Sequence, residues 1–224
     1  TAMRVVLDPG HGGFDPGAVG FQGLREKDVV LSVAKHSAKV LASKGHSVHM
    51  TRTGDYFMPL ADRTTLANQY NADLFVSLHA NGHERTTANG VETYHSAEHP
   101  SSEEAGRVAA FENSVIRYDE RDPGPVRINV EDILFRFERM RLWDTSAKAA
   151  SIVQQGLAQG TPFRDRGVHS ARFHVLRKAR MPAVLLELGF LTNPEEGRML
   201  GTETFQEELG QAVAQAVNGW IQSR

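Results

Sequence analysis

Short apolar runs alternate with helical stretches along this 224-residue chain, and that alternation constrains its fold more than any other feature. The apolar runs predict buried strands at 3–7, 48–50, 73–78, 90–94, 173–176 and 183–190. Between and after them, apolar side chains recur at helical spacing over 27–41, 59–70, 129–158 and 205–220. Strands that alternate with helices usually pair in parallel. We therefore expect an α/β fold with a mixed, mostly parallel sheet and helices on both faces.

One segment interrupts this alternation. Residues 101–116 look helical, and the charged turn RYDERDPGP follows them at 117–125. We interpret the shorter helix and its turn as a helical insertion beside the sheet edge, within about residues 100–128. The longer helix over 129–158 is then an ordinary crossover. Without an internal repeat, the chain is expected to form a single domain over residues 1–224.

Composition excludes several classes of protein. A net charge of −2 argues against a nucleic-acid binder, and no apolar run approaches the ~20 residues of a membrane span. The chain contains no cysteine, so a metal would have to be held by histidine and carboxylate. The first predicted strand begins almost at the start of the sequence, with no signal peptide ahead of it. We interpret this as a mature form or an excised domain.

Three polar residues lie where an α/β sheet places its ligands, at the carboxyl ends of the strands. His11 follows the first strand within a glycine-rich loop, His79 follows DLFVSL, and Glu187 lies within AVLLELGF. Glu26 stands at the start of the first predicted helix. Two imidazoles and a carboxylate form the His₂Glu set that leaves a catalytic zinc with an open fourth position. The glycines would let the His11 loop fold tightly around such an ion.

Glu187 is the most informative single residue. A carboxylate in the middle of an apolar strand costs several kcal/mol if it is buried without a partner. A place beside a metal-activated water would remove that difficulty and give the residue a role as general base. The alternative is a glutamate that points to solvent or pairs with an arginine.

Each candidate also has an ordinary structural interpretation. A lone histidine after a strand is usually a hydrogen-bonded core or loop residue, and Glu26 could simply favour the helix dipole. The glycine loop could be an anion-binding nest, although it lacks both GxxxxGK[ST] and GxGxxG. The His79/His83 spacing suggests a zincin helix, but HExxH is absent and Asn81-Gly82 would break that helix.

Taken together, the motifs resemble a known family. VVLDPGHGGFDPGAVG, Glu26, RTGD, LADRTTLAN, ADLFVSLHAN and MPAVLLELGFLTNPEE occur in the order found in zinc-dependent N-acetylmuramoyl-L-alanine amidases of the type-3 amidase family. The resemblance spans nearly the whole chain. It implies an α/β fold with a six-stranded sheet. It also implies cleavage of the amide between the lactyl group of N-acetylmuramic acid and L-alanine in peptidoglycan.

The resemblance assigns roles to the four candidates. His11, Glu26 and His79 match the zinc ligands, and Glu187 matches the glutamate that activates the metal-bound water. On this basis Zn²⁺ is the expected cofactor and peptidoglycan the expected substrate. The protein is then expected to be exported to the periplasm or cell envelope.

Two further residues are weaker candidates. Asp8 could orient a metal ligand, or it could cap the loop. Arg177, in VLRKARMP, could hold a carboxylate of the stem peptide, or it could form a surface salt bridge.

The insertion suggests regulation. In cell-division members of the family, a helix between the second histidine and the final strands covers the active site, and one of its glutamates occupies the open zinc position. SSEEAGRVAAFENSV resembles that helix, with Glu112 as the candidate blocking ligand and Glu103 and Glu104 as alternatives. The other interpretation is an ordinary solvated surface helix. Such members are released by an activator protein with a degenerate peptidase domain, which is therefore an expected partner.

Two other functions use the same residues. One is a catalytically dead wall-binding or regulatory module, which is disfavoured because all four candidate residues are present. The other is a zinc hydrolase that cuts a different amide, since zinc with a carboxylate serves many amides.

Overall fold

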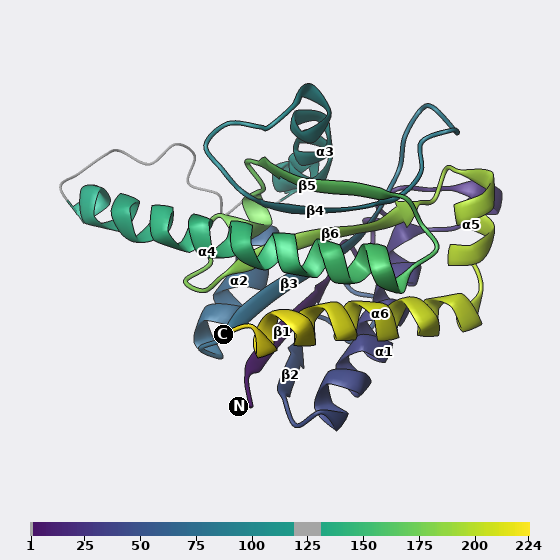
Figure 1. Ribbon diagram of the computed structural model, residues 1–224. Helices are drawn as coiled ribbons and strands as arrows, with labels where there is room; N and C mark the ends of the chain where they lie inside the picture. The colour runs from purple at the N-terminus through teal and green to yellow at the C-terminus, as the bar shows by residue number, and fades with distance from the viewer. Residues whose placement is uncertain (1, 119–130) are drawn as a thin grey trace.

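The computed structural model describes residues 2–118 and 131–224, with side chains for 2–117 and 139–224. Its centre is a six-stranded sheet in the order β2-β1-β3-β6-β4-β5 (Figure 1). The strands are β1 (Arg4–Pro9), β2 (Ser47–Met50), β3 (Leu74–Asn81), β4 (Val91–Ser96), β5 (Asp165–Ala171) and β6 (Ala183–Phe190). This arrangement confirms the expected mixed α/β fold.

The sheet consists of two parallel parts that meet in one antiparallel pairing. β2, β1, β3 and β6 run parallel, as do β4 and β5, whereas β4 runs antiparallel to β6. In register, His79 of β3 lies beside Glu187 of β6, and Glu187 lies beside Glu92 of β4. The sheet topology thus places two of the candidate residues on neighbouring strands.

Helices cover both faces of the sheet. They are α1 (Glu26–Ser43), α2 (Leu60–Gln69), α3 (Glu103–Asn113), α4 (Glu131–Gly160), α5 (Pro194–Leu200) and α6 (Glu203–Gln222). Side chains alternate between the two faces of a strand. Accordingly Val5 and Leu7 join the core under α1, α4 and α6, while Val6 joins a second core under α2 and α3 (Figure 1).

Two elements differ from the sequence expectation. The segment 173–176, expected to be a strand, contains a short 3-10 helix (His174–Leu176), and the sixth strand is β5. β5 has mostly half-buried side chains at the sheet edge and therefore no apolar run. Helix α5 was also missed. It begins with Asn193, whose side chain accepts the amide protons of Glu195 and Glu196.

The expected insertion is only partly described. Residues 103–113 form α3, and Ser114–Tyr118 continue as a 3-10 helix, so a helix lies where it was expected. Most of the charged turn at 117–125 lies outside the described residues. Helix α4 (Glu131–Gly160) lies where the longer helix over 129–158 was expected, and residues 129 and 130 lie outside the described residues.

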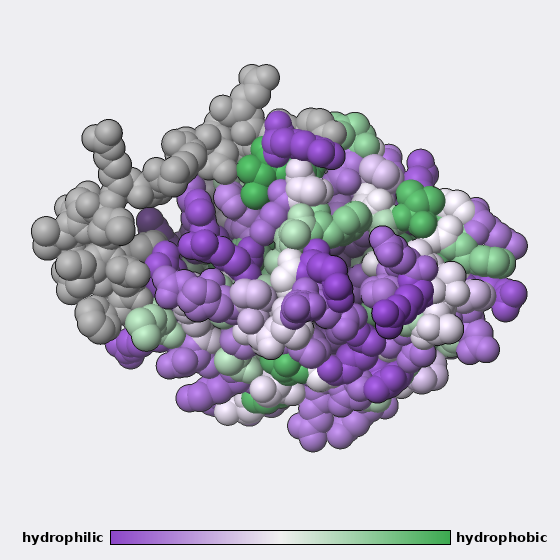
Figure 2. Space-filling view, turned by 90° about the horizontal axis from the view of Figure 1, so that it is seen from above, coloured by the Kyte–Doolittle hydropathy of each residue, from purple (hydrophilic) through white to green (hydrophobic). Residues whose placement is uncertain are grey.

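Polar residues dominate the surface seen from above. Hydrophobic residues form separate patches there rather than one continuous area (Figure 2). Among the described residues, no helix is both long enough and apolar enough to cross a membrane.

Candidate metal centre

Four segments that are distant in the sequence bring nitrogen and carboxylate donors to one point. His11 comes from the loop after β1, Glu26 from the first turn of α1, His79 from the end of β3 and Glu112 from α3. One donor atom from each lies within 4.8 Å of all the others, and all four side chains are buried. The three ligands expected from the sequence are therefore together, with the candidate blocking residue among them.

The His11 ring is held by Asp15. Its Nδ1 lies 2.8 Å from Asp15 Oδ2, which fits donation of the Nδ1 proton to the carboxylate. The lone pair of Nε2 then faces the other donors. His11 itself has a positive φ of 59°, a backbone conformation that is uncommon outside glycine.

The His79 ring is held through its other nitrogen, Nε2. Its Nε2 lies 3.2 Å from Ser77 Oγ, and Ser77 in turn donates to Asp8 Oδ2 at 2.7 Å. This leaves Nδ1 as the nitrogen that faces the centre. Asp8 thus acts on the His79 ring through Ser77, while Asp15 contacts a candidate ligand directly.

Glu26 is fixed by two backbone amides. Ala18 donates to Oε2 at 2.8 Å, and Ala80 donates to Oε1 at 3.0 Å. The carboxylate is 1% exposed although it begins a helix. Oε1 also lies 3.0 Å from His11 Nε2 and 3.0 Å from His79 Nδ1, so one oxygen faces both imidazoles.

Glycine is required where the backbone touches these side chains. A Cβ on Gly10 would overlap the His79 ring, and one on Gly17 would lie 2.5 Å from Glu26 Oε2 and 2.6 Å from His11 Cδ2. The glycine-rich sequence of the loop therefore has a local reason, which is close packing around the donors.

Two buried arginines hold the same loop by hydrogen bonds to its backbone carbonyls. Arg52 donates to the carbonyls of Pro9 and Gly10, at 3.0 and 2.7 Å. Arg63 donates to the carbonyl of His11 at 2.8 Å and to Asp8 Oδ1 at 2.9 Å. Both residues lie in sequence blocks that resemble the amidase family, RTGD and LADRTTLAN, but the sequence analysis gave them no role.

Glu112 completes the donor set from the outer side. Its Oε2 lies 2.9 Å from His79 Nδ1 and 3.3 Å from His11 Nε2. Of the alternatives, Glu104 pairs with Arg166 instead, and Glu103 is exposed. Glu112 is thus the residue of α3 that reaches the centre.

The spacing of the donors fits a tetrahedral metal ion. Zinc–nitrogen and zinc–oxygen bonds of about 2.0–2.1 Å place neighbouring ligand atoms about 3.3 Å apart in a tetrahedron. His11 Nε2 and His79 Nδ1 lie 3.2 Å apart, and each lies 2.9–3.3 Å from the nearer oxygens of Glu26 and Glu112, with all four donor atoms within 4.8 Å of one another. Imidazole donors favour zinc and other transition metals over magnesium or calcium. The residues present therefore fit zinc.

The charges of these groups also favour a cation. Burial alone lowers the pKa of His79, but the carboxylates of Glu112 and Glu26 outweigh it and raise the pKa to about 10. For His11 the same opposition of burial against Glu26 and Glu112 leaves the pKa well above its usual value. The carboxylates therefore favour positive charge on the imidazoles, and a divalent ion would supply that charge instead.

Glu187 is fully buried without a hydrogen-bond partner for either oxygen among the described residues. Burial first, and then the nearby Glu112 carboxylate, raise the pKa of Glu187 well above its usual value. Its neighbour Glu92 is satisfied, because Asn81, Tyr94 and Arg166 all donate to it. Glu187 is thus the orphaned carboxylate that its apolar strand predicted, next to His79 in register.

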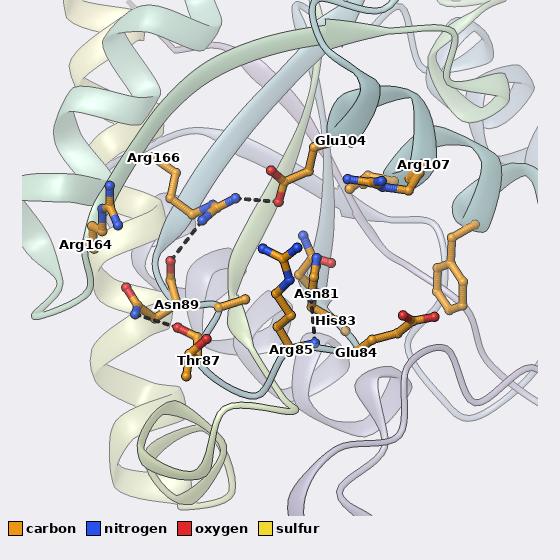
Figure 3. Close-up of a pocket in the computed structure, with 14 residues that line it drawn as sticks. Asn81, His83, Glu84, Arg85, Thr87, Asn89, Glu104, Arg107, Arg164 and Arg166 are labelled. Carbon is orange, nitrogen blue, oxygen red and sulfur yellow. Dashed lines mark hydrogen bonds and ion pairs between the residues drawn. The ribbon is translucent and has the colours of Figure 1, made fainter.

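Arg177 lies elsewhere. It lines a cavity of about 560 Å³ with Arg139, Arg141 and Arg180, and none of the candidate metal ligands lines that cavity. A different cavity, of about 600 Å³, lies near the metal centre, although none of the four donor residues lines it. Asn81 and Phe111 line it, together with Arg85, Arg107, Arg164 and Arg166 (Figure 3). The structure therefore does not bring Arg177 to the site, but it places other arginines in this nearby cavity.

Known proteins with similar sequence and structure agree on one family. Residues 5–219 match the Amidase_3 family of N-acetylmuramoyl-L-alanine amidases. The chain is 36% identical to AmiA of Escherichia coli over 214 residues, which is 95% of this chain and 74% of AmiA. It is 34% identical to AmiC of Neisseria meningitidis over 217 residues, 97% of this chain and 52% of AmiC.

A solved structure agrees with the sequences. AmiC2 of Nostoc punctiforme superposes with a TM-score of 0.75 at 31% identity, covering 98% of this chain and 97% of that one. Together with the family match over nearly the full length, this likeness shows that the chain belongs to the N-acetylmuramoyl-L-alanine amidase family and is a hydrolase of peptidoglycan.

Proposed function

We propose that this chain hydrolyses the amide between the lactyl group of N-acetylmuramic acid and L-alanine, using zinc held by His11, Glu26 and His79. The observation that carries the proposal is the convergence of three donors beside an orphaned buried carboxylate. Their donor atoms are 3.0–3.2 Å apart, and Glu187 lies next to His79 in register. The family membership supports the choice of substrate.

Each residue of the site has a separate role in the proposed reaction. A zinc ion bound to this set supplies Lewis acidity, which makes water more acidic and polarises a carbonyl. Glu187 accepts a proton from the attacking water as the new C–O bond forms at the lactyl carbonyl. The same carboxyl group then gives that proton to the alanine nitrogen as the C–N bond breaks. Asp15 and Ser77 keep the two imidazoles in the orientation that binding requires.

In this proposal Glu112 is an autoinhibitory ligand. Its carboxylate fills the fourth position around the donors, which the substrate carbonyl or water would otherwise use. An activator protein that draws α3 away would then release the site. The contact is small, because Ala105, Ala109 and Glu112 are the buried residues of α3. We place the enzyme in the cell envelope, where its substrate is.

The first test is digestion of purified peptidoglycan with zinc-loaded protein, with the products identified by mass spectrometry. Stem peptides that begin with alanine are expected. The Glu187→Gln variant should bind zinc equally but lose activity by about 10²–10⁴-fold, the range for loss of a general base. Glycan fragments or cross-bridge cleavage instead of free stems would show a different bond specificity.

The second test addresses the blocking ligand. Glu112→Ala should raise the amidase activity of the isolated chain, while Glu103→Ala, on the same helix but exposed, should leave it unchanged. Zinc content is measured in both. If activity and zinc content are the same in Glu112→Ala as in the parent protein, the autoinhibitory role is wrong. If no variant releases stem peptides from peptidoglycan, the proposed cleavage site is wrong.

A further inference from the structure

Arg166 contacts Glu92, the neighbour of Glu187 in register, and is held in an unusually fixed position. Its Nε donates to Glu92 Oε2 at 2.8 Å, and Glu92 is 1% exposed. The guanidinium lies over the Phe190 ring, 5.0 Å from its centroid. Its outer nitrogen Nη2 donates to Glu104 Oε1 at 2.7 Å (Figure 3). Nε of the guanidinium is thus bound to the buried Glu92. Its Nη2 is a fixed hydrogen-bond donor for a carboxylate.

That donor faces a cavity lined by four arginines and two glutamates, Glu84 and Glu104. Arg85 comes from the loop between β3 and β4, Arg107 from α3 and Arg164 from the segment before β5. Figure 3 shows the guanidinium groups of Arg85 and Arg107 directed toward the space beside Glu104. Among the described residues, no ion pair neutralises Arg85, Arg107 or Arg164. Such a cavity suits an anionic ligand.

The cavity lies close to the metal centre. Asn81, which lines it, follows His79 by two residues on β3. Phe111 also lines it, and the Phe111 ring centroid lies 6.5 Å from that of His11. A ligand whose reacting group lies at the centre would therefore extend into the arginine cavity.

Helix α3 already places two carboxylates along this path. Glu112 lies against the imidazoles and Glu104 against Arg166. At 1.5 Å rise per residue their positions on the helix are about 12 Å apart. An extended chain covers that length in about three to four residues. A carboxylate on a side chain or branch reaches further than the backbone that carries it. A stem peptide cut at its first amide would therefore bring a carboxylate of its second or third residue to Arg166.

We propose that the outer face of Arg166 is the binding site for a carboxylate of the stem peptide, and that Glu104 occupies it until substrate replaces it. This inference rests on the proposed amidase function. It assigns substrate selectivity to a residue that lies outside the set of metal ligands and base. It also makes α3 a mimic of the substrate at two points rather than at one.

The test compares soluble muramyl peptides in a Glu112→Ala background. One pair differs at the second residue, D-isoglutamate against D-isoglutamine. The other pair differs at the third, diaminopimelate against lysine. We expect kcat/KM to be on the order of 10-fold higher for the carboxylate in one of the pairs, as for loss of a charge-assisted hydrogen bond. The pair that responds identifies the source of the carboxylate.

Arg166→Lys then tests the residue itself. Lysine keeps a positive charge beside buried Glu92 but lacks the fork that contacts two carboxylates together. The preference between the paired substrates should fall toward one, with hydrolysis of the uncharged member retained. Thermal unfolding checks that the variant is folded. An unchanged preference in a folded variant overturns the inference while the amidase function stands.

Glu104→Gln supplies a second, independent variant. Removing the competing carboxylate should lower KM for the preferred carboxylate substrate and leave KM for its uncharged counterpart unchanged. Glu103→Gln, one residue away and exposed, should alter neither value. Equal effects of Glu104→Gln on both substrates would contradict the inference. Absence of hydrolysis of every substrate would remove the amidase proposal, and this inference with it.

Discussion

Asp15 shows how a single side chain decides which ring nitrogen faces the metal centre. His11 has Nδ1 against Asp15 and Nε2 toward the other donors, whereas His79 has Nε2 against Ser77 and Nδ1 toward them. The two imidazoles therefore use opposite nitrogens. Each depends on a different hydrogen-bond acceptor to keep its orientation.

Replacing Asp15 should therefore weaken zinc binding more than it weakens the fold. We expect Asp15→Asn to lower zinc affinity by about 10–100-fold, the usual effect of losing the partner of a metal-bound histidine. Competition against a chromogenic chelator measures this affinity. Asp28→Asn, which removes an exposed partner of Arg25, is the control and should bind zinc normally. Equal affinities in the two variants would show that Asp15 does not orient His11.

The sequence points to the proposed base and metal ligands more clearly than to the residues that position them. Glu187 stands out because a carboxylate inside an apolar strand needs an explanation. His11 and His79 stand out because they follow strands. Asp15 and Arg166 carry no such signal, since either could be an ordinary surface residue. Their roles depend on ring orientation and on pairing across the sheet, which no local pattern encodes.

At the level of the element, α3 has a side-chain N-cap but few buried hydrophobic side chains. Ser102 caps it by accepting the amide proton of Ala105, at 3.1 Å. It contacts the second core through the small side chains Ala105 and Ala109 and through the half-buried Val108, while Phe111 is 50% exposed. The helix therefore gains little from hydrophobic burial, and its own stability matters to how firmly Glu112 is held.

Loss of this cap should release part of the inhibition. Ser102→Ala is expected to cost α3 about 1 kcal/mol, the usual value for a lost N-cap. If inhibition depends on a folded α3, basal activity should rise by up to about fivefold. Thr202→Ala removes the same kind of cap from α6, far along the chain, and should leave activity unchanged. A fall in activity with Ser102→Ala, or an equal rise in both variants, would contradict the proposal.

Strands that are completely buried were predictable from their continuous apolar sequence. β3 and β6 lie in the middle of the sheet and consist of nearly continuous buried residues. β5 was missed because it is an edge strand with few buried side chains. The apolar segment 173–176 suggested a strand because Phe173, Val175 and Leu176 are buried, but they pack beneath the sheet from a 3-10 turn. Hydrophobicity indicated burial there and not strand geometry.

At the level of the whole molecule, an ion pair buried in the core joins β1 to α2. Asp8 accepts hydrogen bonds from Arg63, Thr51 and Ser77, and Asp8 is 0% and Arg63 1% exposed. Burial alone raises the pKa of Asp8, but Arg63 and the two hydroxyls outweigh it and leave the pKa below its usual value. Its ionised form therefore stabilises the fold above the unfolded-state pKa of about 3.9.

This pair makes a stability prediction with a defined pH dependence. Asp8→Asn should lower the free energy of unfolding by about 3–5 kcal/mol at pH 7, because Arg63 stays buried without its counter-charge. As the pH falls below about 4 and toward the lowered folded-state pKa, the parent protein also loses the charge, so the difference should shrink. Urea unfolding of both proteins at several pH values measures it. A difference that is independent of pH would mean that the Asp8 charge is not responsible.

The position of β6 in the sheet has a consequence for the order in which activity arises. A chain made from its N-terminus contains His11, Glu26 and His79 more than a hundred residues before it contains Glu187. β6 then has to enter between β3 and β4, which precede it in the chain. During synthesis the proposed metal ligands are thus present early, and the proposed general base, Glu187, is present last. A nascent or truncated chain that ends before β6 would be harmless to the polymer that the finished enzyme cuts.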